Sequence, residues 1–343
     1  MKAPLLSVVA TSRNDDHGGN LGARTQLFID GLAEQAERFA FPIELLLVEW
    51  NPPADRPPLR EALRWKDSEH FQPEVITVPH KVHATLSNSE RLPLYQMIAK
   101  NVGIRRARGP YVLATNIDIL LTDELFAFFQ TGLQPNAMYR VDRHDVVARL
   151  DGPTIPTPAE CRALTPIREH RPDGLHDGDG ASRRAPRRSV RPADLPRLAL
   201  GAWYRMMLPR LHTSGCGDFT LTSSEVWSMI RGYPEWPIFS WHIDGVVLYQ
   251  AYALGVEMIN LQPPMVALHL EHGAGSGWTP EGAGELFSRL DAAGVPYMST
   301  NRYRRLARKL VREGRTAQPI NGPDWGLPSA SLPISGFEPR QVG

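Results

Sequence analysis

Apolar runs alternate with helical repeats along the first 125 residues of the chain. Four short runs rich in β-branched and aliphatic side chains occupy residues 5–11, 43–49, 74–79 and 111–115. Runs without an alternating polar face are typical of strands that are covered on both sides. Between these runs, apolar residues at helical spacing predict helices over about 23–39 and 93–107. This order predicts an α/β fold with a Rossmann-like, mostly parallel sheet flanked by helices.

The composition changes between residues 151 and 197. Eight prolines fall in these 47 positions, and four arginines lie in the run 183–188. Such a stretch buries too little apolar surface to order itself independently. We therefore expect a long Pro/Arg-rich loop that is solvated or partly disordered.

Regular structure is predicted again from Gly217 onward. The apolar spacing indicates helices over about 223–231 and 244–254 and a strand over about 256–261. Residues 301–315 form a predicted basic helix with seven Lys/Arg and one Glu. That helix fits either a solvated helix packed on its apolar side or a helix on an anionic membrane surface.

Charge and cysteine content exclude some classes of protein. The 38 basic and 37 acidic side chains nearly cancel, which argues against a nucleic-acid binder that depends on phosphate neutralisation. Two cysteines are too few for a disulfide framework or a thiolate zinc site, and they fit a reducing compartment. No run approaches the roughly 20 apolar residues of a membrane-spanning helix. We therefore expect a soluble, cytoplasmic protein.

Polar residues directly after the run 111–115 are the first candidates for chemistry. Alternation along the chain turns Ile117 into the core and places Asn116 and Asp118 on the same side. A carboxylate at the carboxyl end of a parallel strand, where ligands of α/β sheets collect, can bind a metal ion or a ribose. The same Asn-x-Asp pattern also occurs in ordinary turns.

The segment ahead of these residues resembles glycosyltransferases of the GT-A type, family 2. Those enzymes read Ala-Arg-Asn-x-Gly, then Ala-x-Gly-(Glu)-Tyr, then an apolar strand that ends in Asp-x-Asp. The chain has Ala99-Lys100-Asn101-Val102-Gly103, then Ala107-Arg108-Gly109-Pro110-Tyr111, with the same order and spacing over about 20 residues. It departs from the pattern at Asn116, where the family has the first Asp, and this lowers the negative charge of the expected metal site.

The resemblance implies a nucleotide site in the first half. Val8–Asn14 resembles the opening strand and nucleotide-binding loop of the family, and Glu49 stands where an acidic pair often reads the nucleobase. By this resemblance the donor site is formed by Thr11, Arg13, Glu49, Asn101, Asn116 and Asp118. The implied donor is a nucleotide diphosphate sugar, with a UDP-sugar expected first.

The second half resembles β4-galactosyltransferases and polypeptide GalNAc-transferases. In those enzymes a Gly-rich strand, a helix and a turn precede a Trp-Gly-x-Glu-Asp element that opens a helix. The matching element here is Trp241-His242-Ile243-Asp244. An inverting transferase needs one base beside the acceptor hydroxyl, so Asp244 is the candidate general base, although it could serve only as a helix cap. Asp218, Trp241 and His242 are the candidates for acceptor or sugar contacts.

Two histidines follow this element at the end of an apolar strand. His269 and His272 lie about where the galactosyltransferase-like enzymes place a histidine that binds a metal. With Asp118 they form the expected site for Mn²⁺ or Mg²⁺; the alternative is a core or acceptor-contact role for either histidine.

The resemblance divides the chain into three parts. Residues 1–135 are the expected nucleotide-sugar half, residues 136–280 the acceptor and catalytic half of the same domain, and residues 281–343 C-terminal helices and a tail. The leading hypothesis is an inverting, metal-assisted glycosyltransferase that acts on a small-molecule, glycan or lipid-linked acceptor. The alternatives are a retaining mechanism on the same fold, a nucleotidyltransferase acting on sugar phosphates, and a catalytically decayed nucleotide-sugar-binding protein. Peripheral membrane contact stays open.

Overall fold

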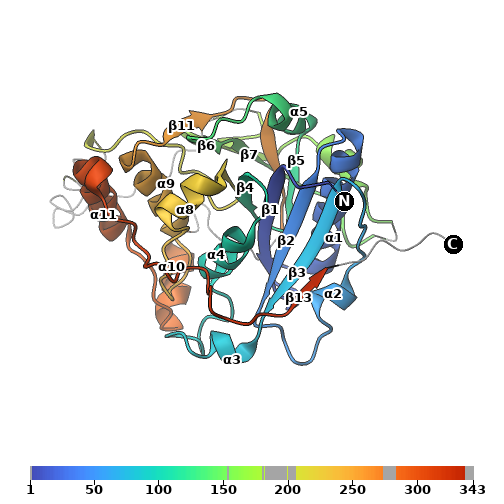
Figure 1. Cartoon of the computed structure of the whole chain (residues 1–343), viewed down its shortest axis with the longest axis horizontal. Helices are drawn as coiled ribbons and strands as arrows, with labels where there is room; N and C mark the ends of the chain where they lie inside the picture. Colours follow the sequence, from blue (N-terminus) through green and yellow to red (C-terminus); the bar gives the residue numbers. More distant parts are fainter. Residues whose placement is uncertain are drawn as a thin grey trace.

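Two β-sheets organise the protein. The computed structural model describes residues 2–152, 154–179, 206–272 and 283–336, together with the single residues 181 and 199. Within this part the larger sheet has eight strands in the order β11-β6-β10-β4-β1-β2-β3-β13, and the smaller sheet has five in the order β5-β12-β7-β8-β9. Helices flank the larger sheet (Figure 1). The α/β class predicted from the sequence is confirmed.

The strands of the larger sheet are β1 (Leu6–Ser12), β2 (Ile43–Trp50), β3 (Phe71–Val78), β4 (Tyr111–Thr115), β6 (Ala137–Arg140), β10 (Phe219–Ser223), β11 (Glu257–Asn260) and β13 (Ile334–Gly336). Those of the smaller sheet are β5 (Ile119–Leu121), β7 (Asp142–Val146), β8 (Arg168–Arg171), β9 (Gly174–Asp177) and β12 (Val266–Leu270). The helices are α1 (Leu21–Arg38), α2 (Leu59–Ala62), α3 (His80–His83), α4 (Gln96–Arg106), α5 (Asp123–Thr131), α6 (Pro158–Arg162), α8 (Ser224–Ile230), α9 (Ile243–Ala253), α10 (Ala283–Ala292), α11 (Thr300–Glu313) and the 3₁₀ turn η2 (Gly314–Thr316).

The central strands are apolar throughout because both of their faces are covered. Along β1, Val8 and Ala10 join the core beneath α1 and α5, whereas Val9 joins the core beneath α4, α8 and α9. Every residue of β1 and β2 is buried. The continuous apolar runs of the sequence are thus explained by burial on two sides.

The larger sheet is mixed: six of its eight strands run in one direction, and β10 and β13 run in the opposite one. The block β4-β1-β2-β3 is parallel, as predicted. Strand β10 runs antiparallel to both of its neighbours, with Phe219 opposite Thr115. After β6, which runs in the same direction as β4, the chain leaves the larger sheet at the end where β4 also finishes and later returns at that end, so β10 runs in the opposite direction.

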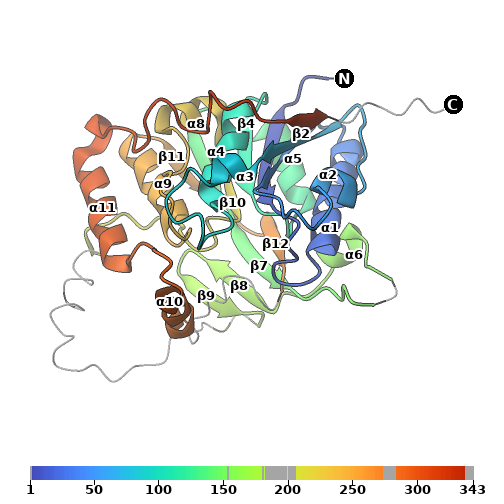
Figure 2. The same cartoon turned by 90° about the horizontal axis from the view of Figure 1, so that it is seen from below.

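The smaller sheet begins directly beyond the carboxyl end of β4. Strand β5 follows after three residues, and β12 pairs with β5 on one side and with β7 on the other. Only Val141 separates β6 of the larger sheet from β7 of the smaller one. Figure 2 shows β7, β8 and β9 on one side of the larger sheet. The two sheets therefore meet where Asn116 and Asp118 lie.

The prediction of a loop over residues 151–197 is wrong for the part around 158–177. Helix α6 starts with a capping box between Thr157 and Glu160, and its Cys161 is buried beside α1 and β12. Strands β8 and β9 form a hairpin that pairs with β7. This segment is ordered because its hairpin pairs with β7 and its Cys161 packs against apolar residues of α1 and β12. It therefore needs no hydrophobic core of its own. Residues 182–198, including the arginine run, lie outside the described residues.

The last described residues form a strap that closes one edge of the larger sheet. We call residues 317–336 the C-terminal strap. Arg105 donates to the carbonyl oxygens of Pro323 and Trp325, and Arg106 donates to those of Gly326 and Leu327. The strap ends in β13, which pairs antiparallel with β3 (Figure 1).

Candidate functional site

Asp118, His269 and His272 converge at the junction of the two sheets. The Nε2 atom of His272 lies 3.1 Å, and that of His269 3.8 Å, from Oδ2 of Asp118. His269 is paired with Ile119 across the β5–β12 ladder, and the Leu270 amide donates to the Asp118 carbonyl oxygen. Because β12 ends at Leu270, the chain turns and brings His272 to the same carboxylate. These three residues could hold a metal ion.

Two buried polar atoms of this group lack a hydrogen-bond partner among the described residues. They are Oδ1 of Asp118 and Nδ1 of His272. Buried polar atoms in proteins are nearly always satisfied, so each exception needs an explanation. One carboxylate and two imidazoles supply oxygen and nitrogen ligands, which suit a divalent metal. The residues present therefore fit a metal site.

Arg24 of α1 stabilises the ionised form of Asp118. Its guanidinium is almost fully buried and donates to Oδ2 of Asp118 at 3.0 Å, and also to the carbonyl oxygens of His17 and Gly19. Burial would raise the pKa of Asp118, but the two histidines and Arg24 more than offset this and hold it well below its usual range. The carboxylate is therefore ionised, as a metal ligand has to be.

The glycine-rich turn after β1 lies against the same group. Gly18 has a φ of +81°, and a Cβ atom there would lie 2.4 Å from Nδ1 of His272 and 2.9 Å from Nη2 of Arg24. A side chain at this position would collide with both groups, and the backbone angle itself favours glycine. The turn thus covers the site from the side of β1.

Asp145 of β7 holds His269 from the side opposite Asp118. It lies next to His269 across the β7–β12 ladder, and its Oδ1 is 3.1 Å from Nδ1 of His269. A hydrogen bond at Nδ1 leaves Nε2 free to face Asp118, which is the arrangement that orients many metal-binding histidines. Asp145 is fully buried and also contacts Arg143, Arg168 and His170.

The surroundings shift the pKa values of Asp145 and His269 in opposite directions. Burial opposes ionisation of Asp145, but hydrogen bonds from His170 and His269 and the charge of Arg143 hold its pKa well below the usual range. Burial and Arg143 lower the pKa of His269, but the carboxylates of Asp145 and Asp118 outweigh them and leave it above the ordinary value.

Asn116 and Asp218 form a second polar group beside the first. The Asn116 side-chain amide donates to Oδ1 of Asp218 at 2.5 Å, while Arg143 donates to Oδ2 of the same carboxylate at 2.7 Å. Lys100 donates to Oδ1 of Asn116 at 2.8 Å and to the Gly217 carbonyl oxygen at 2.7 Å. Arg143 therefore links Asp218 to Asp145, and so to the histidines.

Lys100 is a fully buried ammonium group among carboxylates. Burial lowers its pKa to about 8, against the opposing fields of Asp218, Asp244 and Asp118. Its hydrogen bond places this cation beside Asn116, the residue that stands at the first position of the Asn-x-Asp pattern.

Asp244 lies in the first turn of α9, close to Gly217. A Cβ atom on Gly217 would lie 3.1 Å from Oδ2 of Asp244, and the Gly245 amide donates to Oδ1 at 2.8 Å. Burial raises the pKa of this carboxyl, although the Cys216 thiol donates to it. Asp244 is half-buried, and it is the acidic residue in the first turn of its helix. A carboxylate with a raised pKa is suited to accept a proton.

The aromatic residues before α9 contact α10 and α11. Trp241 packs edge-on against Phe287. His242 stacks on Tyr303 with 4.4 Å between ring centroids, and its Nε2 lies 3.0 Å from the Thr300 hydroxyl. Burial lowers the pKa of His242 to about 4, so the ring is neutral above that pH. Both side chains are half-buried.

Of the six residues predicted for the nucleotide site, Asn116 and Asp118 lie in these polar groups, and the other four bind elsewhere in the fold. Thr11 donates to the Val48 carbonyl oxygen, and Arg13 donates to the Asn51 carbonyl oxygen. Glu49 is fully buried and accepts from the Leu59 amide at 2.7 Å.

The side chain of Asn101 is likewise engaged in hydrogen bonds within the protein. It is fully buried, and its side chain binds both the amide and the carbonyl of Tyr233. Its side chain and those of Thr11 and Glu49 therefore hold chain segments together, while Arg13 is half-buried at the end of β1.

Four contributors to the site were not predicted: Arg24, Lys100, Arg143 and Asp145. Arg24 lies in a helix that the sequence predicts only as amphipathic, and Arg143 and Asp145 lie in a strand made mainly of charged residues (Asp-Arg-His-Asp-Val). The sequence did carry one indication. Arg143 and Asp145 alternate, so as a strand they would share one face.

A comparison of the chain with protein-family models and with curated proteins finds no match. Among the described residues, none of the helices combines the length and the apolar character needed to cross a bilayer.

Proposed function

We propose that this protein is a glycosyltransferase of the GT-A type that takes a sugar from a nucleotide diphosphate donor. The observation that carries the proposal is the group Asp118, His269 and His272 at the carboxyl end of β4, with its two unsatisfied buried atoms. Ligands of α/β proteins collect at this end of the strands. The mixed sheet with a smaller sheet at its carboxyl ends is compatible with that fold type.

The chemistry follows from what the residues can hold. Mn²⁺ or Mg²⁺ bound by Asp118 and the two histidines would neutralise the charge of a departing diphosphate. Arg24 keeps Asp118 ionised, and Asp145 orients His269. Lys100 and Arg143 fix Asn116 and Asp218, which leaves these groups positioned for sugar hydroxyls.

Asp244 is the proposed general base. Its raised pKa suits removal of a proton from an acceptor hydroxyl as the sugar is transferred. Inversion at the anomeric carbon is the outcome expected for one base acting in a single displacement. Both cysteines are buried and free, which supports the expectation of a reducing, cytoplasmic setting.

Binding of nucleotide tests the donor site. Melting temperatures are measured with UDP, GDP, CMP, dTDP and ADP, each with and without Mn²⁺. The wild-type protein should be stabilised by one nucleotide in a metal-dependent way, by about 2.7 kcal/mol at a hundredfold excess over Kd. His272→Ala should lose this stabilisation.

His70→Ala is the matched control for His272→Ala. The two side chains have similar exposed fractions (12% and 10%), and each ring nitrogen lies 3.1 Å from a carboxylate oxygen, of Glu37 and Asp118 respectively. Equal losses in both variants, or no stabilisation by any nucleotide, would remove the donor-site assignment.

Turnover separates an enzyme from a decayed binding protein. Asp244→Asn should keep metal-dependent nucleotide binding and lose donor hydrolysis or sugar transfer. If the wild-type protein binds one nucleotide but consumes none of the matching sugar donors, the decayed-protein alternative replaces the proposal.

A further inference from the structure

We propose that the outer face of α11 docks the protein on an anionic lipid bilayer. This face is formed by Arg302, Arg305, Lys309 and Arg312, which we call the basic face. All four side chains are exposed, and their spacing of three, four and three residues places them in one line along the helix. The opposite side is buried: Tyr303, Ala307 and Leu310 pack with residues of α9.

The concentration of charge is not explained by the stability of the helix. Residues 301–315 carry seven Lys/Arg and one Glu, whereas the whole chain has a formal charge of +1, so the remainder is net negative. Like charges three or four residues apart destabilise a helix. The apolar side already anchors α11 to the fold. The basic face therefore suits a partner of opposite charge.

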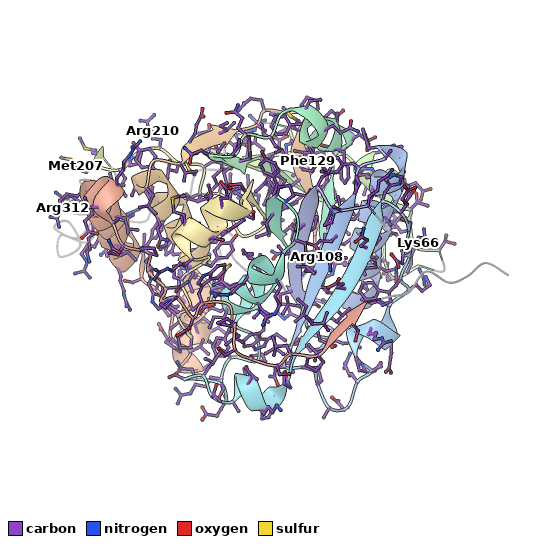
Figure 3. The ribbon with its side chains drawn as sticks, in the orientation of Figure 1. Lys66, Arg108, Phe129, Met207, Arg210 and Arg312 are labelled. Atoms are coloured by element: carbon purple, nitrogen blue, oxygen red, sulfur yellow. The ribbon has the colours of Figure 1, made fainter. Side chains whose placement is uncertain are left out.

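Exposed apolar side chains next to α11 favour a bilayer over a nucleic acid. Met206 is 83% exposed and Met207 is 52% exposed, and the adjacent Leu208 packs into the same cluster as Leu306 of α11. Figure 3 shows Met207, Arg210 and Arg312 at the same end of the molecule. Basic residues beside exposed apolar ones are the composition of interfacial membrane segments.

A hollow of about 440 Å³ lies at the C-terminal end of the basic face. Its lining is half apolar (Leu306, Leu310, Pro319 and Ile320) and half polar (Lys309, Glu313, Thr316 and Gln318). Lys309 lies 3.7 Å from the Glu313 carboxylate there, so the hollow adds no net positive charge to the basic face.

The buried side of α11, opposite the basic face, contacts the segment that leads into Asp244. His242 stacks on Tyr303 and contacts Thr300 at the start of α11, and Asp244 follows two residues later in α9. Helix α11 therefore lies between a membrane on the basic face and Asp244. Where the inference concerns the acceptor it rests on the proposed function, because a transferase held at a bilayer would meet acceptors carried by lipids.

Vesicle co-sedimentation tests the inference. The full chain is mixed with vesicles of phosphatidylcholine alone, or with about one third phosphatidylglycerol, at low and at high salt. The wild-type protein should bind only the anionic vesicles, and 0.5 M NaCl should release it. Each basic residue near an anionic surface strengthens binding by about fivefold, so the triple variant Arg305→Glu, Lys309→Glu and Arg312→Glu should bind at least tenfold more weakly.

The matched control is Arg56→Glu, Arg64→Glu and Lys66→Glu, in the region of α2. These residues are also exposed, and the net change of charge is the same. This control should retain vesicle binding. Met206→Ser with Met207→Ser should weaken binding without changing its dependence on salt. Melting temperatures of all variants, with the nucleotide that stabilises the wild type, report folding and the donor site independently of vesicles.

Two results would overturn the inference. One is a wild-type protein that does not bind anionic vesicles, or that binds heparin in their place. The other is an equal loss of binding in the triple variant and its control. Because nucleotide binding is measured without lipid, failure of the docking surface and failure of the proposed function give different outcomes.

Discussion

The two sheets are held together by different interactions. In the larger sheet, β1 and β2 are buried on both faces by apolar side chains of α1, α4 and α5. In the smaller sheet, Asp145 of β7 is surrounded by two arginines and two histidines from β7, β8 and β12. The scaffold therefore depends on apolar burial, whose contribution to stability does not change with pH. The proposed site depends on paired charges, whose contribution does change with pH.

Removing the central charge of the smaller sheet should have the largest effect. Asp145→Asn leaves buried arginines without their counter-charge, and breaking such a pair costs about 3–5 kcal/mol of unfolding free energy. It should also weaken metal binding about 10–100-fold through the lost support of His269. Urea unfolding and metal titration measure the two effects. Asp173→Asn is the control, since Asp173 also pairs with a histidine but its side chain is 72% exposed.

The stabilising effect of the Asp145 charge should also be measurable in the wild-type protein, as a loss of stability at acid pH. The pKa of Asp145 is lowered in the folded state, so the stability it supplies is present above the pKa of the unfolded chain and is lost as the pH falls below about 4. The loss of stability between pH 5 and pH 2 should be smaller in Asp145→Asn. An identical acid profile in both proteins would contradict the ionic account of this sheet.

A cavity in the larger sheet should be costly but independent of pH. Leu47 is fully buried in β2, and Leu47→Ala should lower the free energy of unfolding by about 2–5 kcal/mol. Urea unfolding at pH 5, 7 and 9 should give the same difference from the wild type each time. A difference in unfolding free energy that varies with pH would show that the stability of the larger sheet depends on pH, as that of the smaller sheet does.

Lys100 connects the two regions and should give an effect of alkaline pH. The pKa of this ammonium is about 8 in the folded protein and 10.5 as the ordinary value, so between these the unfolded chain binds the extra proton. Stability should rise from pH 8 to pH 10.5 in the wild type relative to Lys100→Met, by about 3 kcal/mol at most. The difference between the two chains is the measure, because tyrosines titrate in the same range. A constant difference would contradict the lowered pKa.

An ion pair on the larger sheet should matter least. Glu74 accepts from Arg108 at 2.6 Å, but the arginine side chain is 48% exposed. Exposed pairs contribute about 0–1 kcal/mol, so Glu74→Gln should change the unfolding free energy by less than 1 kcal/mol. A larger loss of unfolding free energy would mean that solvent exposure does not weaken the Glu74–Arg108 ion pair relative to the buried ion pairs of Asp145.

The same division explains what could be predicted from the sequence. The runs at β1, β2 and β4 were recognisable because two-sided burial demands apolar residues without interruption, and α4, α8, α9 and α11 were recognisable from helical spacing. Asp118, His269 and His272 were predicted from the resemblance, and the structure brings them together.

Strand β7 and the hairpin of β8 and β9 were missed for a physical reason. Their residues are charged because they face one another across the ladder, and a single segment does not reveal a partner that lies elsewhere in the sequence. Asn101 was assigned to the nucleotide from its motif, yet its amide is used by Tyr233. A motif does not distinguish a residue that binds a ligand from one that binds the chain.

The C-terminal strap has a consequence for handling the protein. It covers the edge of β3, whose unpaired backbone groups would otherwise be able to pair with a second chain. Many strap residues are exposed, including Pro323, Asp324 and Pro328. A single protease cut there would release β13 and uncover that edge, so a small loss of chain would lead to aggregation of the whole sample.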